Sequence, residues 1–170
     1  MSSTPTLKTL LICFYDIRGF TRLVDQTTTD LDTFVLLNEM ARKAEQHVQS
    51  SGGEVVKFIG DAALIIYPEE RIDDGVRALL ELKTGLQQIL LDHGKKADVL
   101  FALHVGEVAV GPFGTSGRTD VLGSAVNTTA QLEKTPCKST FIISPQLFRR
   151  LSTGTRKLFH KFTPPVVYTA

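Results

Sequence analysis

Two kinds of hydrophobic periodicity alternate along the chain. Short apolar runs at residues 10–15, 55–59 and 63–67 have the length and bulky side chains of buried strands. Apolar positions spaced by three and four residues run from 31 to 50 and from 73 to about 93, which predicts two amphipathic helices. The first part of the chain is therefore predicted to run strand, helix, strand, strand, helix.

Glycine divides the next part of the chain. Residues 99–105 and 107–110 are predicted to be two strands separated by Gly106, and a glycine-rich loop is predicted at 111–117.

The C-terminal part is predicted to contain two more helices. One is expected to begin at Ser124, as its N-cap, and to stop at Pro136. A strand at 140–143, a short helix at 145–152 and a closing strand at 166–168 are expected after it. Since no repeat or low-complexity linker interrupts this order, nothing divides the chain.

Composition fits one cytoplasmic globular domain. The 170 residues are 42% hydrophobic, enough for a single domain over residues 1–170. A net charge of +1 argues against general attraction to nucleic acid or an anionic membrane, and no apolar run reaches the ~20 residues of a spanning helix. Cys13 and Cys137 have neither metal-site spacing nor the density of a disulfide scaffold, which favours a reduced setting.

Two acidic residues stand at the ends of predicted strands. Asp16 ends the first strand and Asp61 lies at the tip of the predicted hairpin, where carboxylates can point into one cleft and bind Mg²⁺ or Mn²⁺. By spacing alone, the commoner role of such residues is to hydrogen-bond a turn. The turn after Asp16 could offer backbone amides to a phosphate, with Gly19 permitting close approach, or be an ordinary strand-to-helix turn.

These segments together resemble the class III adenylate and guanylate cyclases. Residues 14–21 are similar to the first metal motif of that family, an apolar strand followed by Asp-Ile-x-Gly-Phe-Thr, and residues 52–61 to the second. Residues 103–106 and 120–127 follow in the family's order, and the similarity extends from about 11 to 168. The resemblance implies an α+β fold with a ferredoxin-like βαββαβ core, in which helices pack on a mostly antiparallel sheet.

The resemblance also implies a metal-dependent reaction. In the family, the positions of Asp16, Asp61 and the Ile17 carbonyl hold two divalent ions, Mg²⁺ or Mn²⁺, and the turn with Gly19, Phe20 and Thr21 binds the triphosphate. The ribose 3′-oxygen then displaces pyrophosphate to give a cyclic 3′,5′-monophosphate, with the developing charge neutralised by the metal ions.

Lys57 and Asp120 match the family positions that read the base. An ammonium donor and a carboxylate acceptor complement N1 and the exocyclic amine of adenine, whereas guanine presents the reverse pattern. Each buried mismatch would cost about 1–3 kcal/mol, so ATP is expected over GTP. The alternatives are a solvated Lys57, an ordinary loop role for Asp120, and specificity for another base.

One position departs from the family pattern. Asn127 matches the asparagine that orients the ribose, but Gln131 stands where the family has a transition-state arginine. Loss of one transition-state donor costs about 10²–10³ in rate, and loss of a cationic finger about 10³–10⁵. Lys134 or Arg118 could supply a charge in its place, and Lys161 is aligned with a C-terminal lysine that contacts the triphosphate.

The family forms each site from two chains, with metal residues from one and base-reading residues from the other. This chain carries both sets, so the resemblance implies a homodimer with two sites and an inert monomer. We expect an adenylate cyclase in cyclic AMP signalling. The alternative is a weak or inactive cyclase homology domain that binds nucleotide or a partner protein. Because the chain begins shortly before the first predicted strand, regulation is expected from elsewhere unless the chain is a fragment.

Overall fold

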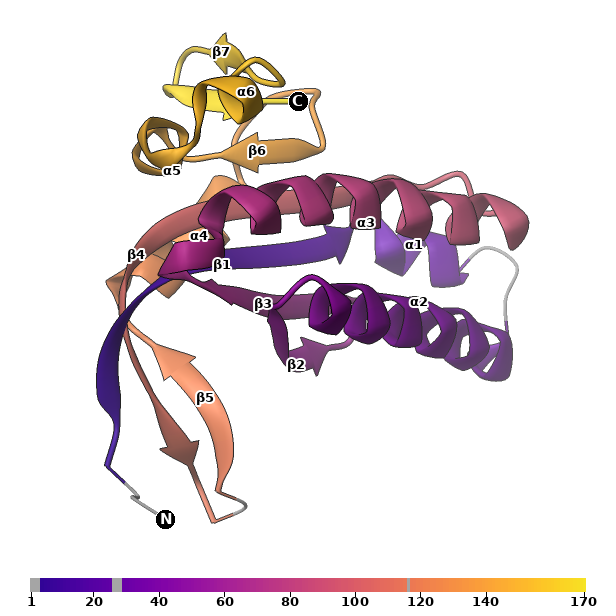
Figure 1. Ribbon diagram of the computed structural model, residues 1–170. Helices are drawn as coiled ribbons and strands as arrows, with labels where there is room; N and C mark the ends of the chain where they lie inside the picture. The colour runs from indigo at the N-terminus through magenta and orange to yellow at the C-terminus, as the bar shows by residue number, and fades with distance from the viewer. Residues whose placement is uncertain (1–3, 26–28, 116) are drawn as a thin grey trace.

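The structure is a computed structural model that describes residues 4–25, 29–115 and 117–170 (Figure 1). Within them, eight strands form one sheet in the order β2-β3-β1-β4-β6-β8-β7, with β5 paired to β4. The strands are β1 (Thr6–Ile17), β2 (Glu54–Ile59), β3 (Ala62–Pro68), β4 (Val99–Phe113), β5 (Arg118–Leu122), β6 (Phe141–Ile143), β7 (His160–Phe162) and β8 (Val167–Thr169). The helices are α1 (Phe20–Asp25), α2 (Asp30–Ser50), the 3₁₀ helix η1 (Glu69–Arg71), α3 (Ile72–Asp92), α4 (Ser124–Leu132), α5 (Pro145–Arg150) and α6 (Thr153–Arg156).

The core has the predicted βαββαβ order. β1, α2, β2, β3, α3 and β4 follow one another, and β1 pairs antiparallel with both β3 and β4. Of the pairings described, that of β4 with β6 is parallel and the others are antiparallel. The predicted α+β class and ferredoxin-like core are therefore confirmed.

The two faces of the sheet are covered unequally. Along β1, Leu11 and Cys13 pack into the core formed with α2 and α3, whereas Leu10 and Ile12 point to the other face. That second face packs against the short helix α4 through Ala125. Because side chains alternate along a strand, every second residue of β1 belongs to the α4 face.

Local sequence signals explain where α2 begins. Thr29 and Asp32 form a capping box, in which the Thr29 hydroxyl accepts from the Asp32 amide and Asp32 accepts from the Thr29 amide. α2 then runs to Ser50, which confirms the helix predicted from 31 to 50. It ends before Gly52, whose φ of 86° suits glycine.

Two predictions around glycine were wrong. Gly106 lies inside β4 opposite Leu10, and does not separate two strands. A side chain at Gly106 would place its Cβ 2.6 Å from that of Ala125, so the glycine makes room for α4 on the sheet. β4 also continues through Gly111 to Phe113 and pairs with β5, which leaves a shorter loop than the predicted 111–117.

The predicted helix ends also needed correction. Gly123 is the N-cap of α4, and Ser124 is the helix's first residue, without a side-chain cap bond. The helix predicted at 145–152 is split in two, because Leu151 is extended and Ser152 caps α6 by accepting from the Thr155 amide.

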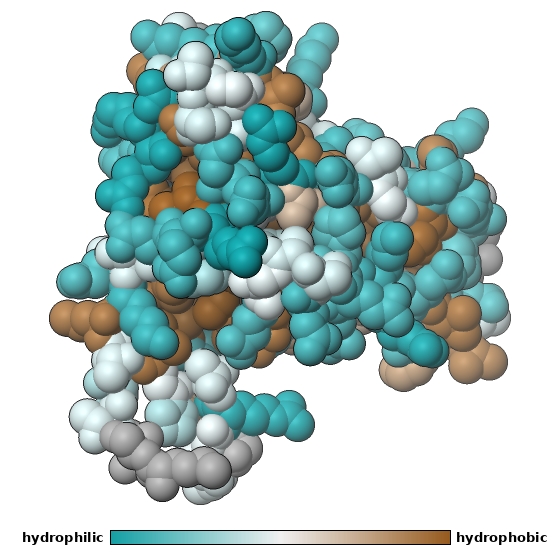
Figure 2. Space-filling view, in the orientation of Figure 1, coloured by the Kyte–Doolittle hydropathy of each residue, from teal (hydrophilic) through white to brown (hydrophobic). Residues whose placement is uncertain are grey.

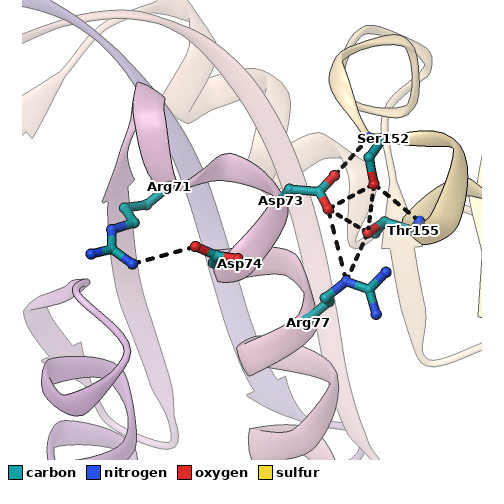
Figure 3. Close-up of polar contacts among 6 residues, drawn as sticks. All are labelled: Arg71, Asp73, Asp74, Arg77, Ser152 and Thr155. Atoms are coloured by element: carbon teal, nitrogen blue, oxygen red, sulfur yellow. Dashed lines mark hydrogen bonds and ion pairs between the residues drawn. The ribbon is translucent and has the colours of Figure 1, made fainter.

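A polar network joins this C-terminal segment to α3 (Figure 3). Asp73, in the first turn of α3, accepts hydrogen bonds from the Ser152 amide at 2.7 Å, the Ser152 hydroxyl at 2.9 Å and the Thr155 hydroxyl at 2.5 Å. Arg77 donates from Nε to the Thr155 hydroxyl at 2.9 Å. The C-terminal helices are thereby fixed against the body of the fold.

Apolar side chains are exposed at several places on the surface, two of which can be followed in Figure 2. In Figure 2, brown surface gathers near the beginning of α2 at lower right and at the base of the β4–β5 arm at left. Leu31 and Phe34 of α2 are 70% and 68% exposed, and Phe113 and Leu122 of the arm are 57% and 52% exposed. None of the helices in the described part of the chain is long and apolar enough to cross a bilayer.

Candidate functional site

The two predicted metal motifs meet at one end of the sheet. β1 and β3 are paired up to Tyr15 and Ala63, so the end of β1 lies beside the turn that holds Asp61. The Ile17 amide donates a hydrogen bond to Asp61 Oδ2 at 3.2 Å, across 44 residues of sequence. The structure therefore brings Asp16, Ile17 and Asp61 together, as the resemblance implied.

The electrostatics of this end of the sheet favour a cation. Asp16 is half-buried, and its Oδ1 is a buried side-chain atom that has no hydrogen-bond partner among the residues that the structure describes. Burial, and then the nearby charge of Asp61, raise the pKa of Asp16, while the charge of Arg18 opposes this. Two adjacent carboxylates and an unsatisfied buried oxygen form a hard-oxygen donor set of the kind that Mg²⁺ and Mn²⁺ prefer.

These carboxylates do not form a complete metal cage. In the described ranges 4–25, 29–115 and 117–170, no group of three or more His, Cys, Asp or Glu side chains could hold a metal ion. Further ligands would have to come from backbone carbonyls, such as that of Ile17, and from a bound triphosphate. Such a site suits ions that arrive with their nucleotide.

The turn after Asp16 leads directly into α1. Gly19 has φ of 72°, and no atom lies within 4 Å of where its Cβ would be, so the chain turns there and is open to approach. Phe20 and Thr21 begin α1. The Arg18 amide donates to the Asp98 carbonyl at 2.9 Å and the Ile17 amide to Asp61, so only amides from Gly19 onward remain for a phosphate.

The two predicted base-reading residues are in direct contact. Lys57 Nζ donates to Asp120 Oδ1 at 2.8 Å and Oδ2 at 2.6 Å, although 63 residues separate them in sequence. The side chain of Asp120 is 14% exposed and that of Lys57 is 40% exposed. Both line a cavity of about 490 Å³, whose wall also includes Phe113 and Arg118. The pair therefore joins β2 to β5 within one chain.

Asp16 and Lys57 lie on the same face of the sheet. Asp16 is two residues beyond Phe14, which packs on the α4 face, and Lys57 stands opposite Leu64 of that face in the β2–β3 ladder. Yet Asp61 lines a different cavity from Lys57, one of about 240 Å³ between α2 and the β2–β3 turn. Within one chain, Lys57 and Asp61 therefore do not share a cavity.

Helix α4 presents the remaining predicted residues. Asn127 and Gln131 are exposed and one turn apart, and no hydrogen bond of either side chain is found among the residues described. Lys134 lies just beyond the helix, where its amide donates to the Gln131 carbonyl at 3.1 Å. The neutral Gln131 therefore has an exposed cation nearby in the chain.

Lys161 is far from the other candidates in sheet order. It is exposed on β7, which forms the edge opposite to β2 and its Lys57. The structure does not bring these two residues together within one chain.

Sequence reasoning missed Glu133. It follows the last residue of α4, and its carboxyl is half-buried. Burial, and then the charge of Asp16, raise the pKa of Glu133 to about 7, against an opposing effect of Lys134. A single acid after a short helix gives no sequence signal of this kind, because the effect depends on how α4 packs against the end of β1.

Known proteins resemble both the fold and the sequence. A solved bacterial light-regulated adenylyl cyclase superposes with a TM-score of 0.80 at 25% identity, over 98% of this chain and 52% of that chain. An adenylate cyclase of Anabaena cylindrica is 27% identical over 134 residues, which are 73% of this chain and 26% of that protein. A receptor-type guanylate cyclase of Caenorhabditis elegans is 31% identical over 133 residues, 73% of this chain and 12% of that protein.

The sheet order and these likenesses define the catalytic-domain fold of class III nucleotide cyclases. The adenylate and guanylate cyclase catalytic domain family matches residues 3–163, and the chain belongs to this family. The chain spans only about a quarter of the Anabaena relative and about an eighth of the nematode one. Since the relatives include adenylate and guanylate cyclases, family membership leaves the base open.

Proposed function

We propose that this domain is an adenylate cyclase, which converts ATP to 3′,5′-cyclic AMP and pyrophosphate at two sites of a homodimer. The observation that carries the choice of base is the contact of Lys57 with Asp120 in one cavity. A donor and an acceptor held side by side complement N1 and the exocyclic amine of adenine. Guanine would face each group with one of its own kind and leave both unpaired.

The half-sites support catalysis between chains. Asp16 and Asp61 line one end of the sheet, whereas Lys57, Asp120 and the exposed face of α4 form the other half. In a two-fold dimer, each half of one chain meets the complementary half of its partner, so two equivalent sites result. The exposed apolar residues of the arm and of α2 are of the kind that such an interface buries.

Each side chain has a role that its chemistry permits. Asp16, Asp61 and the Ile17 carbonyl would hold two divalent ions, Mg²⁺ or Mn²⁺, which supply positive charge to the 3′-oxygen and the triphosphate. Asn127 hydrogen-bonds the ribose and orients its 3′-hydroxyl toward the α-phosphorus. Gln131 donates a hydrogen bond to the developing charge but adds no charge of its own.

Purified protein with ATP and Mn²⁺ tests this function. Cyclic AMP formation is expected to rise more than linearly with protein concentration, because the active species is a dimer. ATP should outcompete GTP, CTP and UTP. If no cyclic nucleotide appears above a metal-free blank at high protein concentration, or if GTP is the preferred substrate, the proposal is wrong.

Gln131 favours a second candidate, a nucleotide-binding domain without turnover. The two differ in their response to Gln131→Arg, which adds the missing cation. For a cyclase whose site is otherwise complete, turnover should rise steeply, toward the factor of about 10³–10⁵ that a cationic finger supplies. Gln131→Lys is the matched control for charge without the planar fork. Nucleotide binding with no turnover in any of the three proteins would establish the second candidate.

A further inference from the structure

Arg18 joins two parts of the chain that belong to different half-sites. It stands two residues after Asp16, and its guanidinium Nη2 donates to the Ser139 carbonyl at 3.1 Å and to the Cys137 carbonyl at 3.4 Å. Its amide also donates to the Asp98 carbonyl at 2.9 Å. The side chain therefore fastens the turn of the metal motif to the segment that leaves α4.

A series of hydrogen bonds leads from that segment back to α4. The Cys137 amide donates to the Thr135 carbonyl at 2.8 Å, the Thr135 amide to the Leu132 carbonyl at 3.0 Å, and the Lys134 amide to the Gln131 carbonyl at 3.1 Å. The carbonyls that Arg18 holds are thus connected through short turns to the end of the helix that carries Gln131.

The same segment is also fixed on its other side. The Ser139 hydroxyl accepts from the Phe141 amide at 3.2 Å and donates to the Ala170 carbonyl at 2.9 Å, which ties it to β6 and to the end of the chain. The effect of Asp16 on the half-buried carboxyl of Glu133 agrees with close packing between the end of α4 and the end of β1. A displacement of the Asp16 turn would therefore be transmitted to α4.

We propose that Arg18 is a positioning residue that couples the two active sites of the dimer. The inference rests on the proposed function, in which the Asp16 turn of a chain serves one site and its α4 serves the other. Through Arg18, the position of the metal-binding turn at one site then determines the position of α4 at the other site. Arginine suits this role, because the two N–H groups of its Nη2 can donate to two carbonyls at the end of a long side chain whose charge stays near Asp16.

A purely local role is the competing explanation. The charge of Arg18 lowers the pKa of Asp16, so loss of that charge alone would weaken metal binding in the site to which Asp16 belongs. A dimer with one functional site separates the two roles. One chain carries Lys57→Ala and Asn127→Ala, and its partner carries Asp61→Asn, so only one site has all its residues.

Arg18→Gln is then introduced into either chain of this dimer. In the Asp61→Asn chain, Arg18 can reach the functional site only through α4. There we expect kcat to fall about tenfold with little change in KM for ATP, since a small displacement of catalytic groups has large effects on rate. Arg42→Gln in the same chain, an exposed arginine of α2, is the matched control and should change nothing. An unchanged kcat with Arg18→Gln in this chain would overturn the proposal.

Arg18→Lys distinguishes charge from the double hydrogen bond. Lysine keeps a charge near Asp16, but its shorter side chain does not reach the two carbonyls, so in the Asp61→Asn chain it should be nearly as harmful as glutamine. In the other chain it should restore most of the activity lost with glutamine. Full rescue by lysine in both chains would overturn the proposal.

Hydrogen exchange tests the tie without nucleotide or metal. In the homodimer with Arg18→Gln, the amides of Lys134, Thr135 and Cys137 should exchange several-fold faster, while that of Ser152 should not change. Equal exchange at the first three amides would overturn the inference even if the protein is an active cyclase. If exchange rises but the one-site dimer with Arg18 intact makes no product, the proposed function fails and the coupling of sites fails with it.

Discussion

Mutations that remove the ion pair between Lys57 and Asp120 should lower the free energy of unfolding. The effect of replacing one partner should depend on whether the other is still present. The two contacts of 2.6 and 2.8 Å are short, and the Asp120 side chain is 14% exposed, but that of Lys57 is 40% exposed. Exposed ion pairs contribute about 0.2–1 kcal/mol, and removal of one partner from a buried pair costs about 3–5 kcal/mol. This intermediate pair should have a coupling energy of about 1–2 kcal/mol.

A double-mutant cycle with Lys57→Met and Asp120→Asn measures this coupling. Urea unfolding of the four proteins, at one protein concentration and without nucleotide, gives each free energy of unfolding. Lys57→Met should be the more harmful single change, because it leaves a poorly solvated carboxylate for which the Val121 amide, at 2.8 Å, is the one remaining donor in the described part of the chain. The double variant should be less destabilised than the sum. Additivity within about 0.5 kcal/mol would refute the reasoning.

Three further changes test other parts of the fold. Since the pKa of Glu133 is raised from 4.5 to about 7, the folded state loses stability as pH rises between these values, and Glu133→Gln should gain about 1–2 kcal/mol above pH 7 once solvent screening is allowed for, in unfolding curves across pH. Gly75→Ala should lower stability by about 1–3 kcal/mol in the same assay, because its Cβ would lie 2.8 Å from the Tyr67 ring. Ser152→Ala removes a bond to Asp73 and the α6 cap, so it should cost about 1 kcal/mol and speed amide exchange in α6.

The order of elements was readable from the sequence because it depends on local patterns. The apolar spacing from 31 to 50 and the hairpin turn that holds Asp61 are short-range signals, and both predicted elements were found. Gly106 misled the prediction, since a glycine inside a strand looks like a break. Glycine is needed there because Ala125 of α4 packs against it, and this contact cannot be predicted from the local sequence.

The site shows the same division. The motifs predicted which residues would gather, and the structure brings Asp16 to Asp61 and Lys57 to Asp120. The partners of Arg18 lie 119 and 121 residues away, at backbone carbonyls that carry no side-chain signal. The raised pKa of Glu133 likewise arises from burial, which sequence does not state. Interactions that arise from packing between distant segments therefore could not be predicted from the motifs.

The end of β1 carries an excess of negative charge, which is unfavourable for the stability of the fold when no cation is bound. Among the described residues, the buried Oδ1 of Asp16 has no hydrogen-bond partner, and the negative charges of Asp16 and Asp61 repel each other. The pKa of the nearby Glu133 is raised to about 7. Such an arrangement destabilises the metal-free fold, because the carboxylates lose hydration and the nearby charges of Arg18 and Lys134 offset this loss only in part. Asp16→Asn should therefore stabilise the metal-free protein, by about 1 kcal/mol at neutral pH, while it weakens Mn²⁺ binding. If Asp16→Asn instead lowers the free energy of unfolding in the presence of a chelator, the carboxylate already has a structural partner. The proposal of a cation at this place would then lose its main physical support.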